Sequence, residues 1–378
     1  MARAFQSPIP GPRIKRSPRR VTQHGKTRID DYAWLRSANW REVLRDPSAL
    51  PGDIRDALTA ENAYCEAVTA PLKPLRAALL NEMRGRIKEN DASVPLADGP
   101  WRYWTEFREG GEFPIFRRIK DGGEAETLFD GDAERGQSAF FGVGAVRHSP
   151  DHRFVAYAVD RVGAESFEIG VRDLETGALR DLAIHHASSA GAIWTAASDG
   201  FFYIERDAHQ RPKRVKLHRL GEGAAADRVI YEEADDAYFL AIGKTQSGAY
   251  VVIESHSHVT TEIRIIPAAA PETAPILIAA REEGVDYAIE HRGEHFFILT
   301  NKNAIDFKIV TAPVSSPGPE RWTDYVPHRP GSFIRFFIVY EQFSVRLEIR
   351  GALPQIIVTD ANGFSQEIAF DEAASAGA

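Results

Sequence analysis

Short strands separated by tight turns dominate this chain, and residues 148–182 show the pattern most clearly. Apolar residues on alternate positions fill 154–159, and a Gly-Ala-Glu-Ser turn at 163–166 leads into a second run at 167–174. Glu-Thr-Gly at 175–177 turns the chain again, into a third run at 179–182. Three or four such strands predict one antiparallel meander. A lone meander cannot bury its apolar face, so several must pack together.

The same turn-then-strand pattern recurs after about residue 98, at residues 199–205, 246–255 and 292–300. The interval of ~45 residues is the four-strand period of a propeller blade. Six such blocks fit between about residue 99 and residue 370. The sequence therefore predicts a mainly β fold, with a β-propeller of about six blades at residues 91–378 and an N-terminal segment at 1–90.

The N-terminal segment combines a basic extended stretch with two predicted helices. Residues 1–28 are rich in Pro and Arg; because the rest of the chain is acidic, we favour an extended segment over a nucleic-acid-binding arm. Tyr32 and Trp34 belong either to a docking segment or to a local hydrophobic staple. Helices are predicted at 54–70 and from Pro74 to before residue 89. The second helix carries one apolar stripe typical of a core, formed by Leu75, Leu79, Met83 and Ile87.

Composition narrows the function classes. The 378 residues carry a net charge of −8, which gives no overall support for a nucleic-acid partner. The one cysteine, Cys65, excludes an internal disulfide. The sequence has no run of 18 apolar residues and no apolar region of a secretion signal near its start, so we expect no membrane partner and a cytoplasmic location.

The motifs of common enzyme classes are missing from the sequence. The nucleophile elbow of serine hydrolases needs Gly-x-Ser-x-Gly, and the segments ending at Ser138 and Ser365 both lack the second glycine. The sequence also has no P-loop, no dinucleotide-binding Gly-x-Gly-x-x-Gly after a strand and no Cys-x-x-Cys. We therefore predict no catalytic residue and no cofactor for this chain.

Two histidine pairs and three acidic pairs are the remaining candidates for chemistry. His256 and His258 would share one face of a strand, but no third ligand is evident near them, and His185-His186 is equally isolated. We favour polar strand ends over a metal site. A glycosidase needs two carboxylates at a set separation, which sequence cannot supply. Acidic turns are the favoured interpretation of residues 232–233, 235–236 and 282–283.

Short segments in order along nearly the whole chain resemble the N-terminal half of oligopeptidase B (protease II), a group within the prolyl oligopeptidase family of serine peptidases. They include Arg-Ile-Asp-Asp-Tyr-Ala-Trp-Leu-Arg at 28–36, Glu-Asn-Ala-Tyr at 61–64, Gly-Gly-Glu-Phe-Pro-Ile at 110–115, Ser-Pro-Asp at 149–151, Val-Arg-Asp-Leu-Glu-Thr-Gly at 171–177, Ser-His-Ser-His at 255–258 and Val-Pro-His-Arg-Pro-Gly at 326–331.

This resemblance implies a seven-bladed propeller that caps an α/β-hydrolase domain and admits oligopeptides but not folded proteins. It also implies that the N-terminal segment packs on the hydrolase domain, which carries the catalytic Ser, Asp and His, and that cleavage follows Lys or Arg. Because the sequence stops at Ala378, we expect the catalytic domain and the seventh blade to lie outside it. Asp324, Ser332 and the histidines do not match the family's catalytic motifs.

Two hypotheses follow. In the first, the chain is the substrate-gating part of such a peptidase: basic oligopeptides pass its tunnel, and a separately encoded or lost hydrolase domain is its partner. In the second, it is a stand-alone propeller that serves as a binding scaffold. We also expect an open ring with a gap between the first and sixth blocks. Apolar side chains should then be exposed at Trp101, Tyr103, Trp104, Phe116, Phe333, Phe336, Phe337, Val339, Val345 and Leu347.

Overall fold

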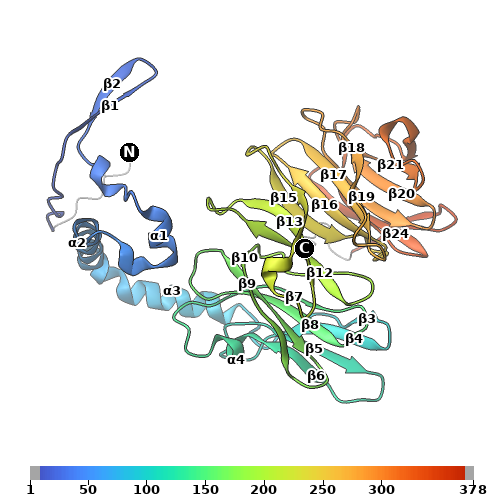
Figure 1. Ribbon diagram of the computed structural model, residues 1–378, viewed down its shortest axis with the longest axis horizontal. Coiled ribbons are helices and arrows are strands. Elements are labelled where there is room, and N and C mark those ends of the chain that lie inside the picture. The colour runs from blue at the N-terminus through green and yellow to red at the C-terminus, as the bar shows by residue number, and fades with distance from the viewer. Residues whose placement is uncertain (1–8, 371–378) are drawn as a thin grey trace. The chain divides into compact units, whose positions relative to one another are not determined.

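The computed structural model describes residues 9–370. By its contacts the chain divides into two compact units, Met1–Ala125 and Glu126–Ala378, and each is described on its own (Figure 1). None of the helices within residues 9–370 combines the length and the apolar character needed to cross a lipid bilayer. The predicted domain boundary at residue 90 stays a prediction, because compactness alone does not show which parts fold independently.

A β-hairpin opens the described part of the first unit. Strand β1 (Arg19–Gln23) pairs antiparallel with β2 (Lys26–Asp30). The turn residues His24 and Gly25 both have positive φ, 51° and 73°, which gives the twist that a two-residue hairpin turn requires. Trp34 donates a hydrogen bond from Nε1 to the backbone oxygen of Lys15 at 3.0 Å. This contact ties the aromatic block to the preceding extended stretch, and both interpretations of the block stay predictions.

Helices follow the hairpin, and the two predicted ones are confirmed. Pro74 lies in the first helical turn, where a missing N–H removes no hydrogen bond, and the helix ends at a glycine. The helical elements of this unit are η1 (Ala33–Leu35), α1 (Trp40–Arg45), η2 (Pro47–Ala49), α2 (Gly52–Thr69), η3 (Ala70–Leu72) and α3 (Lys73–Gly85).

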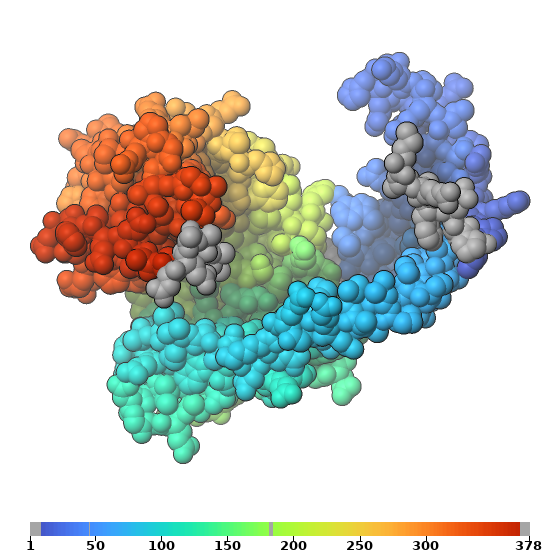
Figure 2. All heavy atoms as spheres, turned by 180° about the vertical axis from the view of Figure 1, so that it is seen from behind, coloured from blue at the N-terminus to red at the C-terminus, as the bar shows by residue number. Residues whose placement is uncertain are grey.

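The apolar stripe on α3 is exposed. Leu75, Leu79 and Met83 expose 56%, 48% and 64% of their surface. The space-filling view shows this helix as a light-blue ridge (Figure 2). The stripe predicted from the sequence is therefore present, and the described residues of the first unit, 9–125, leave this face of α3 exposed.

A short meander completes the first unit. Strands β3 (Leu96–Asp98), β4 (Trp101–Glu106) and β5 (Ile115–Lys120) pair antiparallel in chain order. Trp101, Tyr103, Trp104 and Phe116, predicted to be exposed, are all half-buried. For Trp101 the cause is visible: Arg118 covers its ring, with Cζ 3.9 Å from the ring centroid.

The second unit begins with β6 (Glu126–Asp130) and the short helix α4 (Gly131–Arg135), and then consists of successive antiparallel meanders. The first two meanders join into one sheet, through pairing of β10 with β12. Their strands are β7 (Gly142–His148), β8 (Phe154–Asp160), β9 (Phe167–Asp173), β10 (Leu179–Ala187), β11 (Ile193–Trp194), β12 (Gly200–Arg206), β13 (Pro212–Arg219) and β14 (Arg228–Glu232), with η4 (Ala224–Ala226) before the last.

Three separate four-stranded sheets follow in chain order, so strands of all six predicted blocks are present. The first sheet contains β15 (Phe239–Lys244), β16 (Tyr250–His256), β17 (Thr261–Pro267) and β18 (Ile276–Ala279). The second contains β19 (Tyr287–Arg292), β20 (His295–Thr300), β21 (Lys308–Pro313) and, after η5 (Pro319–Arg321), β22 (Thr323–Val326). The last contains β23 (Ser332–Val339), β24 (Phe343–Arg350), β25 (Leu353–Asp360) and β26 (Ser365–Glu367).

Each inner meander of this unit buries both of its faces, because successive side chains of a strand point to opposite sides. In β12, Phe201 and Tyr203 join the apolar core shared with the preceding meander. Phe202 and Ile204, the residues between and after them, join the core shared with the following one. Four such cores lie between the five meanders β7 to β26. This face-to-face stacking is the arrangement of propeller blades that the repeat predicted.

Within the second unit, the last sheet buries only one face. Phe337 and Val339 face the preceding sheet and are 8% and 1% exposed, so their predicted exposure is wrong. A β-bulge between Ile334 and Phe336 resets the alternation, which sequence alone did not reveal. Phe336 is 51% exposed, as predicted. The central positions of this outer face are apolar and none of their side chains is buried, whereas Asp360 and Gln366 lie at its margin: the apolar residues are Phe333, Phe336, Ile338, Val345, Leu347, Ile349, Ile356 and Val358.

Candidate functional site

The hydroxyl and carboxylate groups considered for catalysis have structural partners. Ser332 donates from Oγ to Glu348 at 2.6 Å, and Asp324 binds the Lys308 ammonium at 2.8 Å. The Ser138 hydroxyl accepts a 3.4 Å hydrogen bond from Arg161. None of these contacts includes a histidine that would act as a general base. The structure therefore does not bring the sequence candidates together, and the absence of catalytic residues stays a prediction.

The three acidic pairs are held by cations. Glu232 accepts from Arg214 at 3.1 Å, and Asp236 binds Lys213 at 3.0 Å. Glu282 pairs with Lys302. Carboxylates engaged in this way are not available as the acid and base of a glycosidase. The acidic-turn interpretation fits the structure better.

Glu233 is the most buried carboxylate of these pairs and lies in a polar network. It accepts hydrogen bonds from Ser255, from Arg281 and from the Tyr231 hydroxyl, the last at 3.0 Å. Burial alone would raise its pKa, but these donors and the backbone N–H of Asp235 together lower it. Because these donors occupy the acceptor sites of its carboxylate, we interpret Glu233 as a structural residue and not as a ligand-binding one.

A second buried network contains a histidine that sequence reasoning did not single out. The His218 Nδ1 lies 2.7 Å from Oδ1 of Asp227, and the Tyr203 hydroxyl donates to Oδ2 at 2.7 Å. Burial, reinforced by this hydrogen bond, raises the pKa of Tyr203. The side chains of His218 and Asp227 are almost entirely buried, so no substrate can reach them. This network is structural as well.

The two histidine pairs singled out in the sequence have carboxylate neighbours in the structure. Nδ1 of His256 lies 3.1 Å from Oε1 of Glu254, its neighbour on the same face of β16, whereas His258 is exposed beyond the strand. His185 lies 3.4 Å from Glu168. Among the described residues, neither pair belongs to a group of three side chains that could hold a metal.

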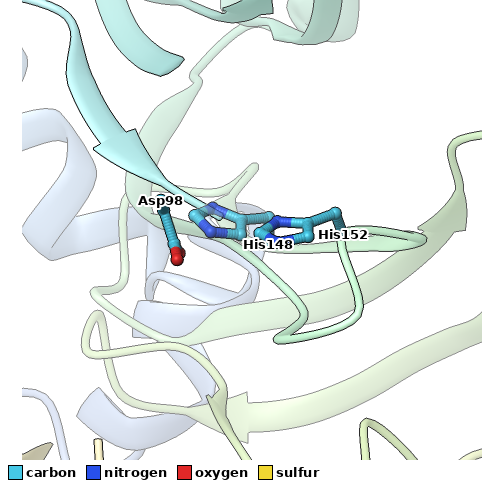
Figure 3. A group of neighbouring side chains, drawn as sticks. All are labelled: Asp98, His148 and His152. Atoms are coloured by element: carbon cyan, nitrogen blue, oxygen red, sulfur yellow. The ribbon is translucent and has the colours of Figure 1, made fainter. Parts of the chain in front are cut away.

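A different pair comes closer to a ligand arrangement. His148 ends β7 and His152 lies in the following turn; their rings stack with centroids 5.6 Å apart (Figure 3). Sequence reasoning used Ser149-Pro150-Asp151 as one of the segments that carry the family resemblance. The signal that it missed was the spacing of one histidine on each side of that turn. Asp98, also labelled in the figure, belongs to the first unit.

Two half-exposed carboxylates of the second unit are poorly solvated. Burial raises the pKa of Glu254, and the charge of Asp286 acts in the same direction while His256 opposes it. Burial also raises the pKa of Glu290, although it accepts a 2.8 Å hydrogen bond from the backbone N–H of Gln246. A desolvated carboxylate that still reaches solvent is stabilised by an approaching cation.

Comparison with known proteins agrees with this picture of stacked blades. Residues 12–377 match the family model described as the prolyl oligopeptidase N-terminal β-propeller domain. Dipeptidyl aminopeptidase BI of Pseudoxanthomonas mexicana is 36% identical over 371 residues, covering 93% of this chain and 50% of the relative. Protease 2 of Moraxella lacunata is 30% identical over 312 residues, covering 80% of this chain and 44% of the relative.

Solved structures show the same fold. Oligopeptidase B from Leishmania major superposes with a TM-score of 0.86 at 24% identity, covering 96% of this chain and 54% of that one. Oligopeptidase B from Trypanosoma brucei, solved in a closed form with covalently bound antipain, gives 0.84 with the same identity and coverage. The chain thus spans about half the length of the relatives it matches. It belongs to the prolyl oligopeptidase family, of which it contains the N-terminal β-propeller domain.

Proposed function

We propose that this chain is the substrate-gating propeller part of a peptidase that acts on basic oligopeptides, with the catalytic groups supplied by an α/β-hydrolase domain outside residues 1–378. The match to the family's propeller domain over residues 12–377 is the observation that carries this proposal. A gate of this kind selects substrates by size and charge before they reach the catalytic groups.

The charge distribution supports basic substrates. Residues 126–378 contain 24 Lys and Arg against 37 Asp and Glu, a net charge of −13, whereas residues 1–125 carry 22 against 17, a net +5. The acidic excess therefore belongs to the stacked blades. A surface of one sign raises the local concentration of oppositely charged ligands. Glu254 and Glu290, desolvated but half-exposed, are suited to contact a cationic side chain.

Peptide binding to the whole chain tests the gating role. We expect a labelled (Gly-Arg)₅ peptide to bind, and its affinity to fall several-fold between about 0.05 M and 0.5 M salt, because exposed charges are screened. A (Gly-Glu)₅ peptide is the matched control and should bind more weakly at low salt. Equal affinity for the two peptides, or an affinity for (Gly-Arg)₅ that does not depend on salt, would contradict an electrostatic gate.

Hydrolysis assays test where the catalytic groups lie. The chain alone should not cleave Arg- or Lys-linked reporter peptides, since no activated serine is present. Addition of the separately expressed hydrolase part of the Pseudoxanthomonas relative should allow cleavage that a serine-directed inhibitor blocks. Turnover by the purified chain alone, sensitive to that inhibitor, would refute the proposal.

Dipeptide release is a second candidate activity for the complete enzyme, favoured by the 36% identity to dipeptidyl aminopeptidase BI. Reporter peptides with free and with blocked amino ends separate it from cleavage within a peptide, because release of an N-terminal dipeptide requires the free end.

The stand-alone scaffold remains the alternative. The exposed apolar outer face of the last sheet and the exposed stripe on α3 speak against it, since monomeric proteins rarely expose large apolar patches.

A further inference from the structure

The turn between β7 and β8 has the same backbone geometry as the corresponding turns of the next two meanders. In each turn, the first residue donates its N–H to the backbone oxygen of the residue that begins the next strand. The residue three positions after that first residue donates its N–H to the first residue's backbone oxygen. The equivalent residues are Ser149 and His152, Thr195 and Ser198, and Thr245 and Gly248. The second residue of each pair has a left-handed φ, 62° for His152, 59° for Ser198 and 70° for Gly248.

A left-handed backbone favours glycine, but asparagine, aspartate and histidine are enriched among the other residues that adopt it. The equivalent turn carries Ser198 at nearly the same φ, so the two imidazoles, and not the backbone, point to a ligand site. The position just before each turn also differs: it holds His148 in this meander but Trp194 and Lys244 in the next two. Only this one of the three turns places two imidazoles around it.

The two rings lie close enough for joint coordination. One ring nitrogen of His148 lies within 4.8 Å of one of His152, and the ring planes differ by 20°. Both side chains are half-buried rather than sealed from solvent. A zinc ion bonds to imidazole nitrogen at about 2.0–2.1 Å, so two ligands lie roughly 3.3 Å apart. Because the rings are stacked, side-chain rotation must turn their in-plane lone pairs towards one ion as it shortens this separation.

Two cations flank the histidines in the sequence: Arg147 precedes His148 in β7, and Arg153 follows His152. The guanidinium of Arg153 lies 3.1 Å from the carboxylate of Asp173, so the positive charge of Arg153 is balanced by that carboxylate. The carboxylate of Asp151 lies in the same turn, where it accepts from the Ser149 hydroxyl at 2.5 Å and from the backbone N–H of Arg153 at 3.1 Å.

We propose that His148 and His152 form a two-histidine site for a divalent transition-metal cation of the class that prefers imidazole, such as Zn²⁺, Ni²⁺ or Cu²⁺. Water completes the coordination. Asp98 is left out of this ligand set. The bound ion links the end of β7 to the turn that follows it, and so fixes the edge of this blade.

Titration of the full chain with ZnCl₂ by calorimetry tests the site. We expect binding of Zn²⁺ that weakens at least about tenfold in His148→Asn and in His152→Gly. The glycine variant suits the left-handed backbone, so it removes the imidazole while the turn is preserved. A double variant, His256→Asn with His258→Asn, is the matched control and should bind as the unaltered chain does.

The proposal is overturned if the unaltered chain binds no Zn²⁺, or if His152→Gly binds it as tightly. It is also overturned if the His256 and His258 double variant alone loses the binding, since the ion would then belong to the other pair. Should His148→Asn fail to fold, as judged by circular dichroism, the glycine variant still decides the question.

Discussion

Phe336 and Phe337 are adjacent in β23 but lie on opposite faces of the last sheet, so they form a matched pair. Phe337 is 8% exposed and packs in the core shared with the preceding sheet, with its ring centroid 6.2 Å from that of Phe297. Phe336 lies on the outer face and is 51% exposed. Substituting each by alanine separates the contribution of a buried face from that of an open one.

The expected losses of unfolding free energy differ several-fold. Truncation of a well-packed phenylalanine to alanine costs about 3–5 kcal/mol, and we expect this for Phe337→Ala. Full burial of such a side chain is worth about 1.5–3 kcal/mol, and Phe336 realises only half of it, so Phe336→Ala should cost about 1 kcal/mol. The two substitutions remove the same atoms, so the difference reports the environment alone.

Urea unfolding followed by tryptophan fluorescence measures both losses, with Trp194 and Trp322 as reporters within the second unit. Binding of a hydrophobic dye provides the second measurement. Phe336→Ser should lower dye fluorescence, because it removes apolar surface, while Phe337→Ala should raise it through local loosening. Equal destabilisation by the two alanine variants would refute the assignment of faces, and so would a cost for Phe336→Ala above that for Phe337→Ala.

Two further predictions concern buried polar groups. Tyr287 accepts from the N–H of Ile263 at 2.7 Å, so Tyr287→Phe should cost about 1–3 kcal/mol by leaving that donor unpaired, measured by urea unfolding. Burial raises the pKa of Tyr287 to about 12. The contribution of Tyr287 to stability is therefore complete below about pH 10 and is lost as pH rises towards 12. If Tyr287→Phe lost stability in alkali as steeply as the unaltered chain, this assignment would be contradicted. The pKa of Glu233 is lowered, so Glu233 stabilises the fold above about pH 4.3 and this contribution is lost as pH falls further. Glu233→Gln should therefore reduce the loss of thermal stability in acid, measured as the melting temperature against pH.

Much of the fold could be predicted from the sequence, because each blade is marked by short-range patterns in its own residues. Turn residues at fixed spacing and period-two apolar runs located strands in all six blocks, and the stripe from Leu75 to Met83 located α3. The assignment of faces could not be read so simply. The bulge in β23 adds one residue, Arg335, and shifts the alternation, so Phe337 turned out to be buried where exposure was expected.

The candidate site was harder to predict for a related reason. His148 and His152 are separated by a turn, and neither strand nor helix periodicity brings them together. A left-handed φ at His152 does so, and that conformation is set by the hydrogen bond from its N–H to the Ser149 oxygen. His256 and His258 looked more promising because they share strand periodicity, yet His258 lies past the end of β16. Spacing along the chain was the weaker guide in both cases.

The outer face of the last sheet bears directly on the choice between a gating part and a stand-alone scaffold. In the inner meanders, a face with this composition is always covered by the next meander, as Phe297 and Leu299 of β20 are covered by β23. Phe336, Leu347 and Ile356 are aligned across β23, β24 and β25 on the same kind of face, and none is buried. Leaving such side chains half-exposed forgoes on the order of 1 kcal/mol each. A protein that functions alone gains from polar residues there, whereas one that works against a further apolar surface gains from the residues observed. The composition of this single face therefore favours a propeller that operates as part of a larger peptidase.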